Sequence, residues 1–224
     1  ADEDPEVGVI ILTGAGDRAF SSGGDVKWDI ENLKDYTHLD YPDMVGAMRK
    51  CTKPIIAAVK GYAIGGGNWL AYFCDLTIAA DNAIFGQNGA RVASPAGGYW
   101  VNYATRLMGE KRAREMWYLC RRYSAQEAKE MGLVNFVVPL EKFDEEVDRL
   151  AEEILDKSPT VLKLLKYSFD MASDLQRGYG YTLIQKMFAP DFVHGPENRE
   201  GEYAFVEKRQ PNFRQFRKRT ETNS

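Results

Sequence analysis

The sequence predicts an α/β protein in which short strands alternate with helices, followed by a mainly helical C-terminal region. In the first half, β-rich runs such as Val9-Ile10-Ile11-Leu12 and Ile55-Ile56-Ala57-Ala58-Val59 alternate with helical segments, as in repeated ββα units. From Trp100 onward the pattern is mainly helical. The chain has 224 residues, 44% of them hydrophobic and 28% charged, so one globular domain with a helical appendage is expected.

The elements follow in chain order. Strands are expected at residues 7–13, 54–60, 75–80, 83–86 and 134–138. A polar, aromatic and mobile loop is expected over 28–40, and helices over 42–50, 68–73, 99–108, 111–121 and 141–156. Ser124 and Glu127 form a capping box that opens another helix, and Ser158-Pro159 supplies the N-cap and first-turn proline of the next. Residues 1–140 are expected to form the core, and residues 141–224 a helical region used for oligomerisation.

Two glycine-dense turns are the most informative feature for function. Phe20-Ser21-Ser22-Gly23-Gly24-Asp25 and Gly61-Tyr62-Ala63-Ile64-Gly65-Gly66-Gly67 each follow a strand-like run. Glycine permits backbone conformations that point amide N–H groups into a pocket. The second turn leads into a helix, whose first N–H groups have no partner within the helix and carry the positive end of its dipole. Two such donors at one point would stabilise a carbonyl oxygen as it becomes an enolate.

The order of these motifs resembles the crotonase (enoyl-CoA hydratase/isomerase) superfamily, whose members stabilise enolates of acyl-CoA thioesters. The resemblance covers nearly the whole chain, because three further blocks occur in the same order: Cys74-Asp75-Leu76-Thr77-Ile78-Ala79-Ala80, Ala83-Ile84-Phe85-Gly86-Gln87 and Ala125-Gln126-Glu127-Ala128-Lys129-Glu130-Met131-Gly132-Leu133-Val134. It implies a crotonase (ClpP-like) fold and a coenzyme A thioester as substrate, with no further cofactor. It also implies a strand-and-helix segment before the first strand, which is expected to be missing here.

The resemblance assigns the oxyanion donors to the backbone N–H groups of Gly24 and Gly66. The neighbouring turn residues Ser22, Gly23 and Asp25 are expected to contact substrate, although Asp25 equally fits a role in capping the turn. Hydratases of the family carry two carboxylates, at positions that hold Trp69 and Gly89 here. An indole and a glycine carry no proton, so ordinary enoyl-CoA hydration is not expected.

A second set of motifs resembles one branch of the superfamily, which contains 2-ketocyclohexanecarboxyl-CoA hydrolase and 1,4-dihydroxy-2-naphthoyl-CoA synthase. The motifs are Gln87-Asn88-Gly89, Ser94, Gly97-Gly98-Tyr99, Gly109-Glu110-Lys111-Arg112-Ala113-Arg114-Glu115-Met116-Trp117-Tyr118-Leu119-Cys120, Arg199-Glu200-Gly201 and Glu207-Lys208-Arg209-Gln210-Pro211-Asn212-Phe213. The branch places an aspartate where this chain has Ala96, and a tyrosine near Val193. Both proton carriers are therefore replaced.

The remaining candidates come from the same segments. His194 lies beside the position of the missing tyrosine and titrates near neutral pH, so it is the first choice of proton carrier, or else a solvated loop residue. Ser94, Tyr99, Asn88 and the loop tyrosines Tyr36 and Tyr41 are candidates to orient water or a carbonyl, with Tyr99 equally suited to the core. Substrate contacts are also expected from Gln87, Gly89 and Ala96. Trp69 would either line the acyl pocket or face into the core.

These residues favour a hydrolase that opens an alicyclic β-ketoacyl-CoA by C–C bond cleavage, in aromatic or alicyclic acid degradation. Three alternatives stay open: a naphthoate-synthase-type enzyme that closes a ring, a cyclic enoyl-CoA hydratase, and a non-catalytic acyl-CoA-binding subunit. The resemblance further implies a homotrimer or a hexamer made of two trimers.

Composition limits the partners. A net charge of −4 argues against nucleic acid, while the basic tail would meet coenzyme A phosphates or solvent. No apolar run is long enough to span a bilayer. Three widely spaced cysteines and two histidines predict a reduced, cytoplasmic protein without a metal site.

Overall fold

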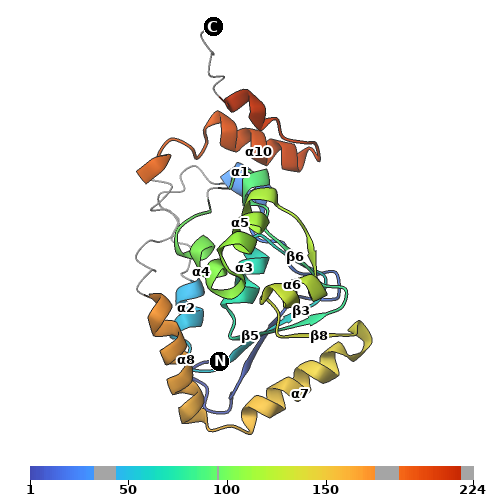
Figure 1. The fold of residues 1–224 in the computed structure, drawn as a ribbon, viewed down its shortest axis with the longest axis vertical. Helices are drawn as coiled ribbons and strands as arrows, with labels where there is room; N and C mark the ends of the chain where they lie inside the picture. The colour runs from blue at the N-terminus through green and yellow to red at the C-terminus, as the bar shows by residue number, and fades with distance from the viewer. Residues whose placement is uncertain (33–43, 95, 175–186, 218–224) are drawn as a thin grey trace.

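The computed structural model describes residues 1–32, 44–94, 96–174 and 187–217, which form two four-stranded sheets surrounded by helices (Figure 1). The first sheet has the order β1-β3-β5-β8 and all of its neighbours are parallel. The second has the order β2-β4-β6-β7, parallel except for the antiparallel pair of β6 and β7. The strands are β1 Ile10–Thr13, β2 Ala19–Ser21, β3 Ile55–Val59, β4 Tyr62–Ile64, β5 Leu76–Ala80, β6 Ile84–Gly86, β7 Tyr123–Ser124 and β8 Phe136–Val138.

The chain builds both sheets together by repeating one unit. In each of three successive units the first strand joins one sheet and the next strand joins the other, giving β1 and β2, β3 and β4, and β5 and β6. Each unit then runs into helical structure: α1 Val26–Asn32 and α2 Met44–Lys50, then α3 Gly66–Phe73, then the 3₁₀ turn Gly89–Arg91 and α4 Tyr99–Met108. The predicted repeated ββα core is confirmed.

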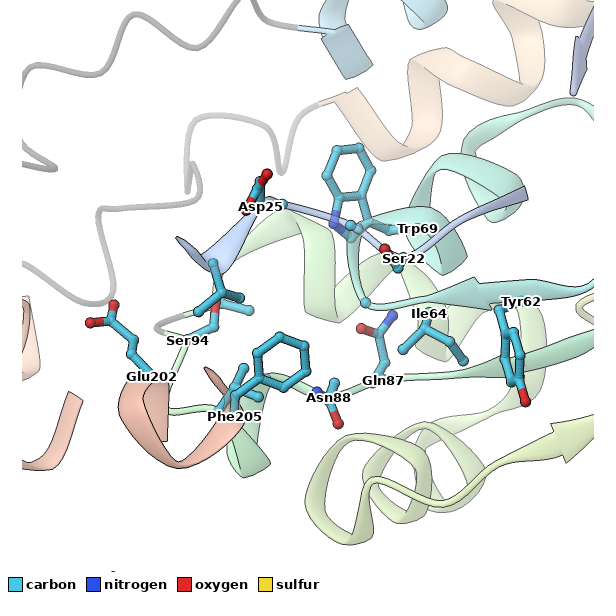
Figure 2. Close-up of a pocket in the computed structure, with 18 of the residues that line it drawn as sticks. Ser22, Asp25, Tyr62, Ile64, Trp69, Gln87, Asn88, Ser94, Glu202 and Phe205 are labelled. Carbon is cyan, nitrogen blue, oxygen red and sulfur yellow. The ribbon is translucent and has the colours of Figure 1, made fainter. Parts of the chain in front are cut away.

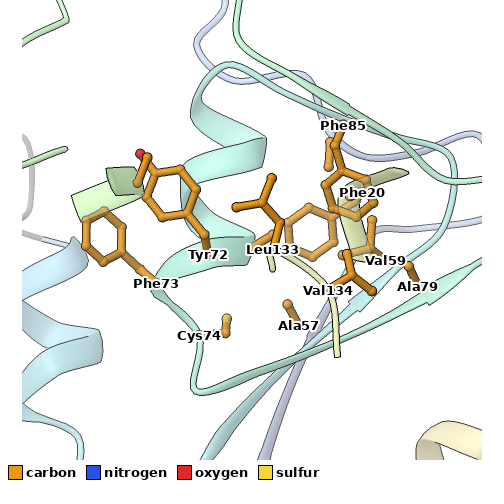
Figure 3. Close-up of a cluster of buried hydrophobic side chains, with 14 of the residues drawn as sticks. Phe20, Ala57, Val59, Tyr72, Phe73, Cys74, Ala79, Phe85, Leu133 and Val134 are labelled. Atoms are coloured by element: carbon orange, nitrogen blue, oxygen red, sulfur yellow. The ribbon is translucent and has the colours of Figure 1, made fainter. Parts of the chain in front are cut away.

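The central strand β3 is buried on both faces, because helices cover the parallel sheet to which it belongs. Ile55, Ala57 and Val59 face the main core, which Figure 3 shows together with Phe20, Tyr72, Phe73, Phe85, Leu133 and Val134. Ile56 and Ala58 face a second cluster, formed with one side of α7. This double burial explains why the strand reads as a continuous apolar run rather than an alternating one.

Within the described residues, the remaining long elements are the helices α5 Glu110–Leu119, α6 Ala125–Met131, α7 Phe143–Leu155, α8 Pro159–Asp174 and α10 Pro196–Val206, with 3₁₀ turns at Leu140–Lys142 and Phe213–Phe216. The predicted capping box is present: the Ser124 Oγ accepts from the Glu127 N–H at 3.3 Å, and the Glu127 carboxylate accepts from the Ser124 N–H at 2.7 Å. In Figure 1, α7 lies at the opposite end of the molecule from α10, which sits beside α1 and α5.

Three short strands were not predicted. β2, β4 and β7 are only two or three residues long, and two of them adjoin the glycine turns. Their pairing is set by neighbouring strands far away in the sequence, so no local pattern reveals them. The loop expected over residues 28–40 is also wrong at its start, because α1 extends to Asn32. Tyr36 and Tyr41 lie outside the described residues.

Candidate active site

The two glycine turns meet backbone to backbone. Gly23 has a φ of +91°, and a Cβ there would lie 2.8 Å from the Gly66 nitrogen and 3.3 Å from the Ile64 carbonyl oxygen. A Cβ on Gly66 would in turn lie 3.0 Å from the Gly23 Cα, and one on Gly67 only 1.9 Å from the Ser21 carbonyl oxygen. Only glycine fits this approach, so the sequence brings the peptides around Gly23 and Gly66 into direct contact.

The second turn presents the open N-terminus of α3. Gly65, with φ 58°, is the N-cap and supplies no side-chain hydrogen bond, and its own N–H donates to the Gly86 carbonyl at 2.9 Å. Gly66 is the first helical residue, so its N–H has no acceptor within the helix. Backbone N–H groups without an acceptor in the helix, and the positive end of the helix dipole, both favour negative charge at this point. The arrangement suits an oxygen that gains charge during a reaction.

A cavity of about 770 Å³ opens against both turns (Figure 2). Five parts of the chain form it: the first turn and α1, the β4–α3 turn, the segment from Gln87 to Ala96, α5, and α10. Its described lining consists of Ala19, Ser22, Gly23, Gly24, Asp25, Val26, Lys27, Tyr62, Ile64, Gly65, Gly66, Trp69, Gln87, Asn88, Gly89, Val92, Ser94, Ala96, Trp117, Arg122, Asn198, Glu202 and Phe205. Of the site residues expected from the sequence, Tyr99 and His194 are not among them, and Tyr36 and Tyr41 lie outside the described residues.

Tyr99 and His194 lie elsewhere. Tyr99 is 3% exposed, stacks on Phe73 with ring centroids 5.5 Å apart, and donates its hydroxyl to Ser173 Oγ at 3.2 Å. It therefore belongs to the core, the other reading that the sequence left open. His194 has a φ of 64° and its backbone N–H donates to Asn198 Oδ1 at 2.9 Å. His194 is not among the residues that line the cavity, although its hydrogen-bond partner Asn198 is.

The sequence allowed two placements for Trp69, in the cavity wall or in the core, and the structure shows it in the cavity wall. Its indole lies beside Gly66, with Nε1 3.3 Å from the place where a Gly66 Cβ would be. Behind it, Trp100 packs edge-on with ring centroids 4.6 Å apart and an interplanar angle of 64°. Edge-to-face packing of this kind holds both rings in one orientation, so Trp69 forms a fixed, flat wall next to the donor of α3.

The wall formed by β6, the turn after it and α5 is polar but uncharged. Gln87 is 1% exposed, and its Nε2 has no hydrogen-bond partner among the described residues. The same holds for Asn88 Oδ1 and for Trp117 Nε1, two further buried atoms of cavity-lining residues. A buried polar atom without a partner is costly. Two donors and one acceptor therefore stand ready for a polar group of a ligand or for water.

Two charged side chains at the rim have structural partners. The Asp25 Oδ1 accepts from the backbone N–H groups of Lys27 and Trp28, each at 3.1 Å, and so caps α1. The Arg122 Nη1 donates to the Gln87 carbonyl at 3.3 Å. Desolvation, followed by repulsion from Arg91, lowers the pKa of Arg122, although a guanidinium stays protonated.

The lining contributed by α10 was missed at the sequence level. Asn198, Glu202 and Phe205 reach the cavity from one helix face, as their spacing of four and three residues requires. That spacing was readable in the sequence, but nothing local indicates that this face meets residues more than 100 positions earlier. Tyr62 and Trp117 were likewise named as parts of motifs without a site role, and no site role was predicted for Arg122.

The described part of the chain offers no group of three His, Cys, Asp or Glu side chains that would hold a metal ion. Within the same residues, no helix combines the length and the apolar character needed to cross a bilayer.

Comparison with known proteins places this geometry in a family. Residues 1–217 match the family model described as enoyl-CoA hydratase/isomerase. A methylmalonyl-CoA decarboxylase solved with 2-nitronate-propionyl-CoA is similar at a TM-score of 0.84 and 26% identity, over 94% of this chain and 82% of that one. An enoyl-CoA hydratase subunit from Geobacillus kaustophilus is 35% identical, with a TM-score of 0.69 over 95% of this chain and 82% of the other.

A monofunctional enoyl-CoA isomerase from M. smegmatis shares 36% identity and a TM-score of 0.62, covering 77% of this chain and 75% of its own. The names of these neighbours denote different reactions, so the feature shared by this chain and all of them is the fold. The match over residues 1–217, on the fold and the paired glycine turns described above, shows that the chain belongs to the enoyl-CoA hydratase/isomerase family, the crotonase superfamily.

Proposed function

We propose that this protein binds an alicyclic β-ketoacyl-CoA and opens its ring by hydrolysis of a C–C bond. The observation that carries the proposal is the contact of the Gly23 and Gly66 peptides at the open N-terminus of α3, against a cavity of about 770 Å³. The thioester carbonyl oxygen would lie between the N–H groups of Gly24 and Gly66. Such donors stabilise an enolate without any movement during the reaction.

The bond changes balance with water as the only co-reactant. The water oxygen bonds to the ring ketone carbon, and the bond from that carbon to the α-carbon of the thioester breaks. The electron pair of the broken bond enters the α-carbon and is delocalised onto the thioester oxygen as an enolate. A proton taken from water then reaches the α-carbon. The product is a dicarboxylic acid bound to coenzyme A as a monothioester.

The acyl half of the cavity supports a cyclic substrate. The fixed Trp69 indole offers a flat apolar wall, on which a ring packs better than an extended chain. The polar groups of the cavity are Gln87 Nε2 and Trp117 Nε1, two buried donors suited to a ketone oxygen, and Asn88 Oδ1, an acceptor suited to water. With Trp69 and Gly89 in place of the hydratase carboxylates, addition of water to a linear enoyl thioester has no proton carrier there.

Three other functions are compatible with the same two N–H donors, those of Gly24 and Gly66, and they differ in the reaction that follows binding. A naphthoate-synthase-type ring closure and a cyclic enoyl-CoA hydratase both need the thioester enolate. A non-catalytic acyl-CoA-binding subunit is favoured by the absence of acids at positions 69, 89 and 96. We place the ring-opening activity in the degradation of aromatic or alicyclic acids, in a reducing cytoplasm that suits the free Cys51, Cys74 and Cys120.

A homotrimer, or a hexamer of two trimers, is proposed as the working assembly. Helix α8 supports it, since one helix exposes a large set of apolar side chains: Val161, Leu164, Leu165, Tyr167, Phe169 and Met171, of which Phe169 and Met171 are 76% and 73% exposed. Exposed apolar surface of this extent is typical of subunit contacts. Light scattering during size-exclusion chromatography would give three or six times the 25.3 kDa chain mass, and a monomeric mass would contradict the assembly.

The reaction is tested by incubating the protein with a panel of cyclic β-keto, cyclic enoyl and linear enoyl thioesters of coenzyme A and weighing the products. Ring opening yields a dicarboxylic monothioester, which is distinguished from a simple hydrate by its one free carboxylate, because this group forms a methyl ester on esterification. A hydrate of a cyclic enoyl thioester would instead support the hydratase, a ring-closed product would support the condensing enzyme, and binding without turnover would support the subunit. Gly23→Ala is the matched inactive control.

A further inference from the structure

Trp69 turns the nitrogen edge of its indole toward the first residue of α3. It follows Gly66 by three positions, so both lie on one face of the helix, and helical side chains lean toward the N-terminus. Its Nε1 and Cε2 lie 3.3 and 3.4 Å from the place that a Gly66 Cβ would take. In Figure 2 the nitrogen-bearing ring of Trp69 lies on the side of the chain between Ser22 and Asp25, and the six-membered ring points away. The N–H edge is therefore the part of the indole nearest to the glycine turns.

This edge is close enough to Gly66 for both residues to bind the same oxygen. A Cβ lies about 2.5 Å from the backbone nitrogen of its own residue. The Trp69 Nε1 and the Gly66 nitrogen are therefore no more than about 6 Å apart. Hydrogen bonds of up to about 3.2 Å let one oxygen accept from two nitrogens at that separation. Glycine at position 66 is needed for this approach, because a Cβ would be tightly packed against the indole.

The indole N–H is available to a ligand. An indole nitrogen can only donate, and no described residue accepts a hydrogen bond from Trp69 Nε1. The side chain is half-buried and lines the cavity. By contrast, the Gly65 N–H at the same turn already donates to the Gly86 carbonyl at 2.9 Å. The donors left for a ligand at the start of α3 thus include this side chain as well as the backbone.

Trp100 of α4 holds the indole in this orientation. It packs edge-on against Trp69, with ring centroids 4.6 Å apart, and edge-on against Phe73, with ring centroids 5.5 Å apart. Its backbone carbonyl also accepts a hydrogen bond from the Tyr72 hydroxyl. Phe73 and Tyr72 both belong to α3, so Trp100 is attached to the helix that carries Trp69. A donor fixed in advance needs no reorganisation when charge develops on its acceptor.

We propose that Trp69 is a catalytic residue whose indole N–H donates a third hydrogen bond to the thioester oxygen, beside the N–H groups of Gly24 and Gly66. This inference rests on the thioester placement of the proposed function. When the C–C bond breaks, its electron pair is delocalised onto that oxygen, and a hydrogen bond to a charged acceptor is stronger than one to a neutral acceptor. The tryptophan that stands in place of a hydratase carboxylate would then stabilise charge instead of transferring a proton.

Two measurements test the third donor. The first is the infrared band of the thioester carbonyl in bound cyclohexanecarboxyl-CoA, labelled with carbon-13 at that carbonyl, which requires no turnover. The band should lie at lower wavenumber in the wild-type complex than in solution. Trp69→Phe keeps an aromatic wall and should lose roughly a third of this shift, because one of three donors is removed. The second is ring opening of a cyclic β-ketoacyl-CoA, which Trp69→Phe should slow about tenfold.

Trp28→Phe is the matched control, because Trp28 is 51% exposed and does not line the cavity. It should behave like the wild type in both measurements. Incorporation of β-(3-benzothienyl)alanine at position 69 replaces the N–H by sulfur in a ring of nearly the same shape, and it should reproduce Trp69→Phe.

A wild-type band or a wild-type rate in both variants at position 69 would contradict the role of Trp69. Wild-type protein that shifts the band but opens no ring would contradict the proposed reaction and leave the third donor standing. A band at its solution position in the wild-type complex would contradict the thioester site, and with it both proposals.

Discussion

At residue 23 two properties of glycine, its left-handed backbone and its close contact with Gly66, have separate consequences. Gly23 and Gly16 both have positive φ values, of 91° and 72°. Only Gly23 has a neighbour: a Cβ there would lie 2.8 Å from the Gly66 nitrogen, whereas a Cβ at Gly16 would meet nothing within 4 Å. Comparing substitutions at Gly23 and Gly16 therefore separates the effect of backbone strain from the effect of displacing the proposed oxyanion donor.

We expect Gly23→Ala to lower turnover by about 100-fold or more, the usual effect of losing one oxyanion donor. Gly16→Ala should leave turnover unchanged and cost only the strain of a left-handed alanine, about 1 kcal/mol of unfolding free energy. Steady-state kinetics and urea denaturation of both variants provide the check. Equal effects of the two substitutions on turnover would mean that the contact with Gly66 has no catalytic role.

Trp69 sets the second residue-scale prediction. Replacing it with alanine removes the flat wall and the edge-on contact with Trp100, an interaction worth about 1 kcal/mol beyond burial. We expect kcat/KM for cyclic thioesters to fall about tenfold, while thioesters of short linear acids bind as before. Competition binding with the two kinds of thioester measures the ratio directly. An unchanged ratio would show that the indole does not contact the acyl group.

Individual residues of the site were predictable only where backbone chemistry specifies them. The two turns can come into backbone contact only if positions 23, 66 and 67 are glycine, and these glycines can be recognised in the sequence. Whether Trp69 or Tyr99 faces the cavity depends on rotation of a helix by a fraction of a turn, which neighbouring sequence does not determine. The structure places the first at the cavity and the second in the core.

Among the elements, α8 is attached through a buried ion pair. Arg49 of α2 binds the Asp170 carboxylate at 2.6 Å, with side chains 5% and 7% exposed, and also donates to the Asp170 carbonyl at 3.0 Å. Removing one member of such a pair leaves an uncompensated buried charge. The attachment therefore matters more to stability than the exposed ion pair of Arg114 and Glu110 on α5, whose side chains are 54% and 65% exposed.

Asp170→Asn should lower the free energy of unfolding by about 3 kcal/mol, measured by urea denaturation. Glu110→Gln, which breaks the exposed pair, should change it by less than about 0.5 kcal/mol. Similar losses in both variants would contradict the structural importance assigned to the contact between α2 and α8.

The element α10 gives a prediction about acid stability. Hydrogen bonds from Arg209, and then from the Asn212 N–H, lower the pKa of Glu200 from 4.5 to about 2. A carboxyl group whose pKa is depressed in the folded state stabilises the protein above its unfolded pKa, and this stabilisation disappears as pH falls toward 2. Glu200→Gln should therefore flatten the dependence of unfolding free energy on pH between about 4.5 and 2. A slope equal to that of wild type would show that the tie to Arg209 does not persist in solution.

The helices α4 and α7 were predicted nearly to their ends, because their periodicity is local: residues 99–108 match α4, and 141–156 contain α7. The capping box before α6 was legible for the same reason. By contrast, β2 and β4 form only because the parallel partner strand is present, and α1 follows a cap by Asp25 whose side chain was equally suited to the substrate site. Long-range pairing decided the two strands.

At the scale of the whole molecule, alternation of strands between two sheets explains where the cavity lies. Each unit crosses from one sheet to the other, and the turns after β2, β4 and β6 all end at one region. The first two turns contain the glycines, and the third contains Gln87 to Gly89. Helix α10 closes this region from a distant part of the chain, so its carboxylate and amide were out of reach of sequence reasoning.

The most direct test of the central claim is a crystal structure with a non-reactive cyclic acyl-CoA analogue bound. The structure predicts that the thioester carbonyl oxygen lies within about 3.2 Å of the nitrogens of both Gly24 and Gly66, with the ring against Trp69. A thioester oxygen more than about 3.5 Å from both nitrogens would contradict the proposed site.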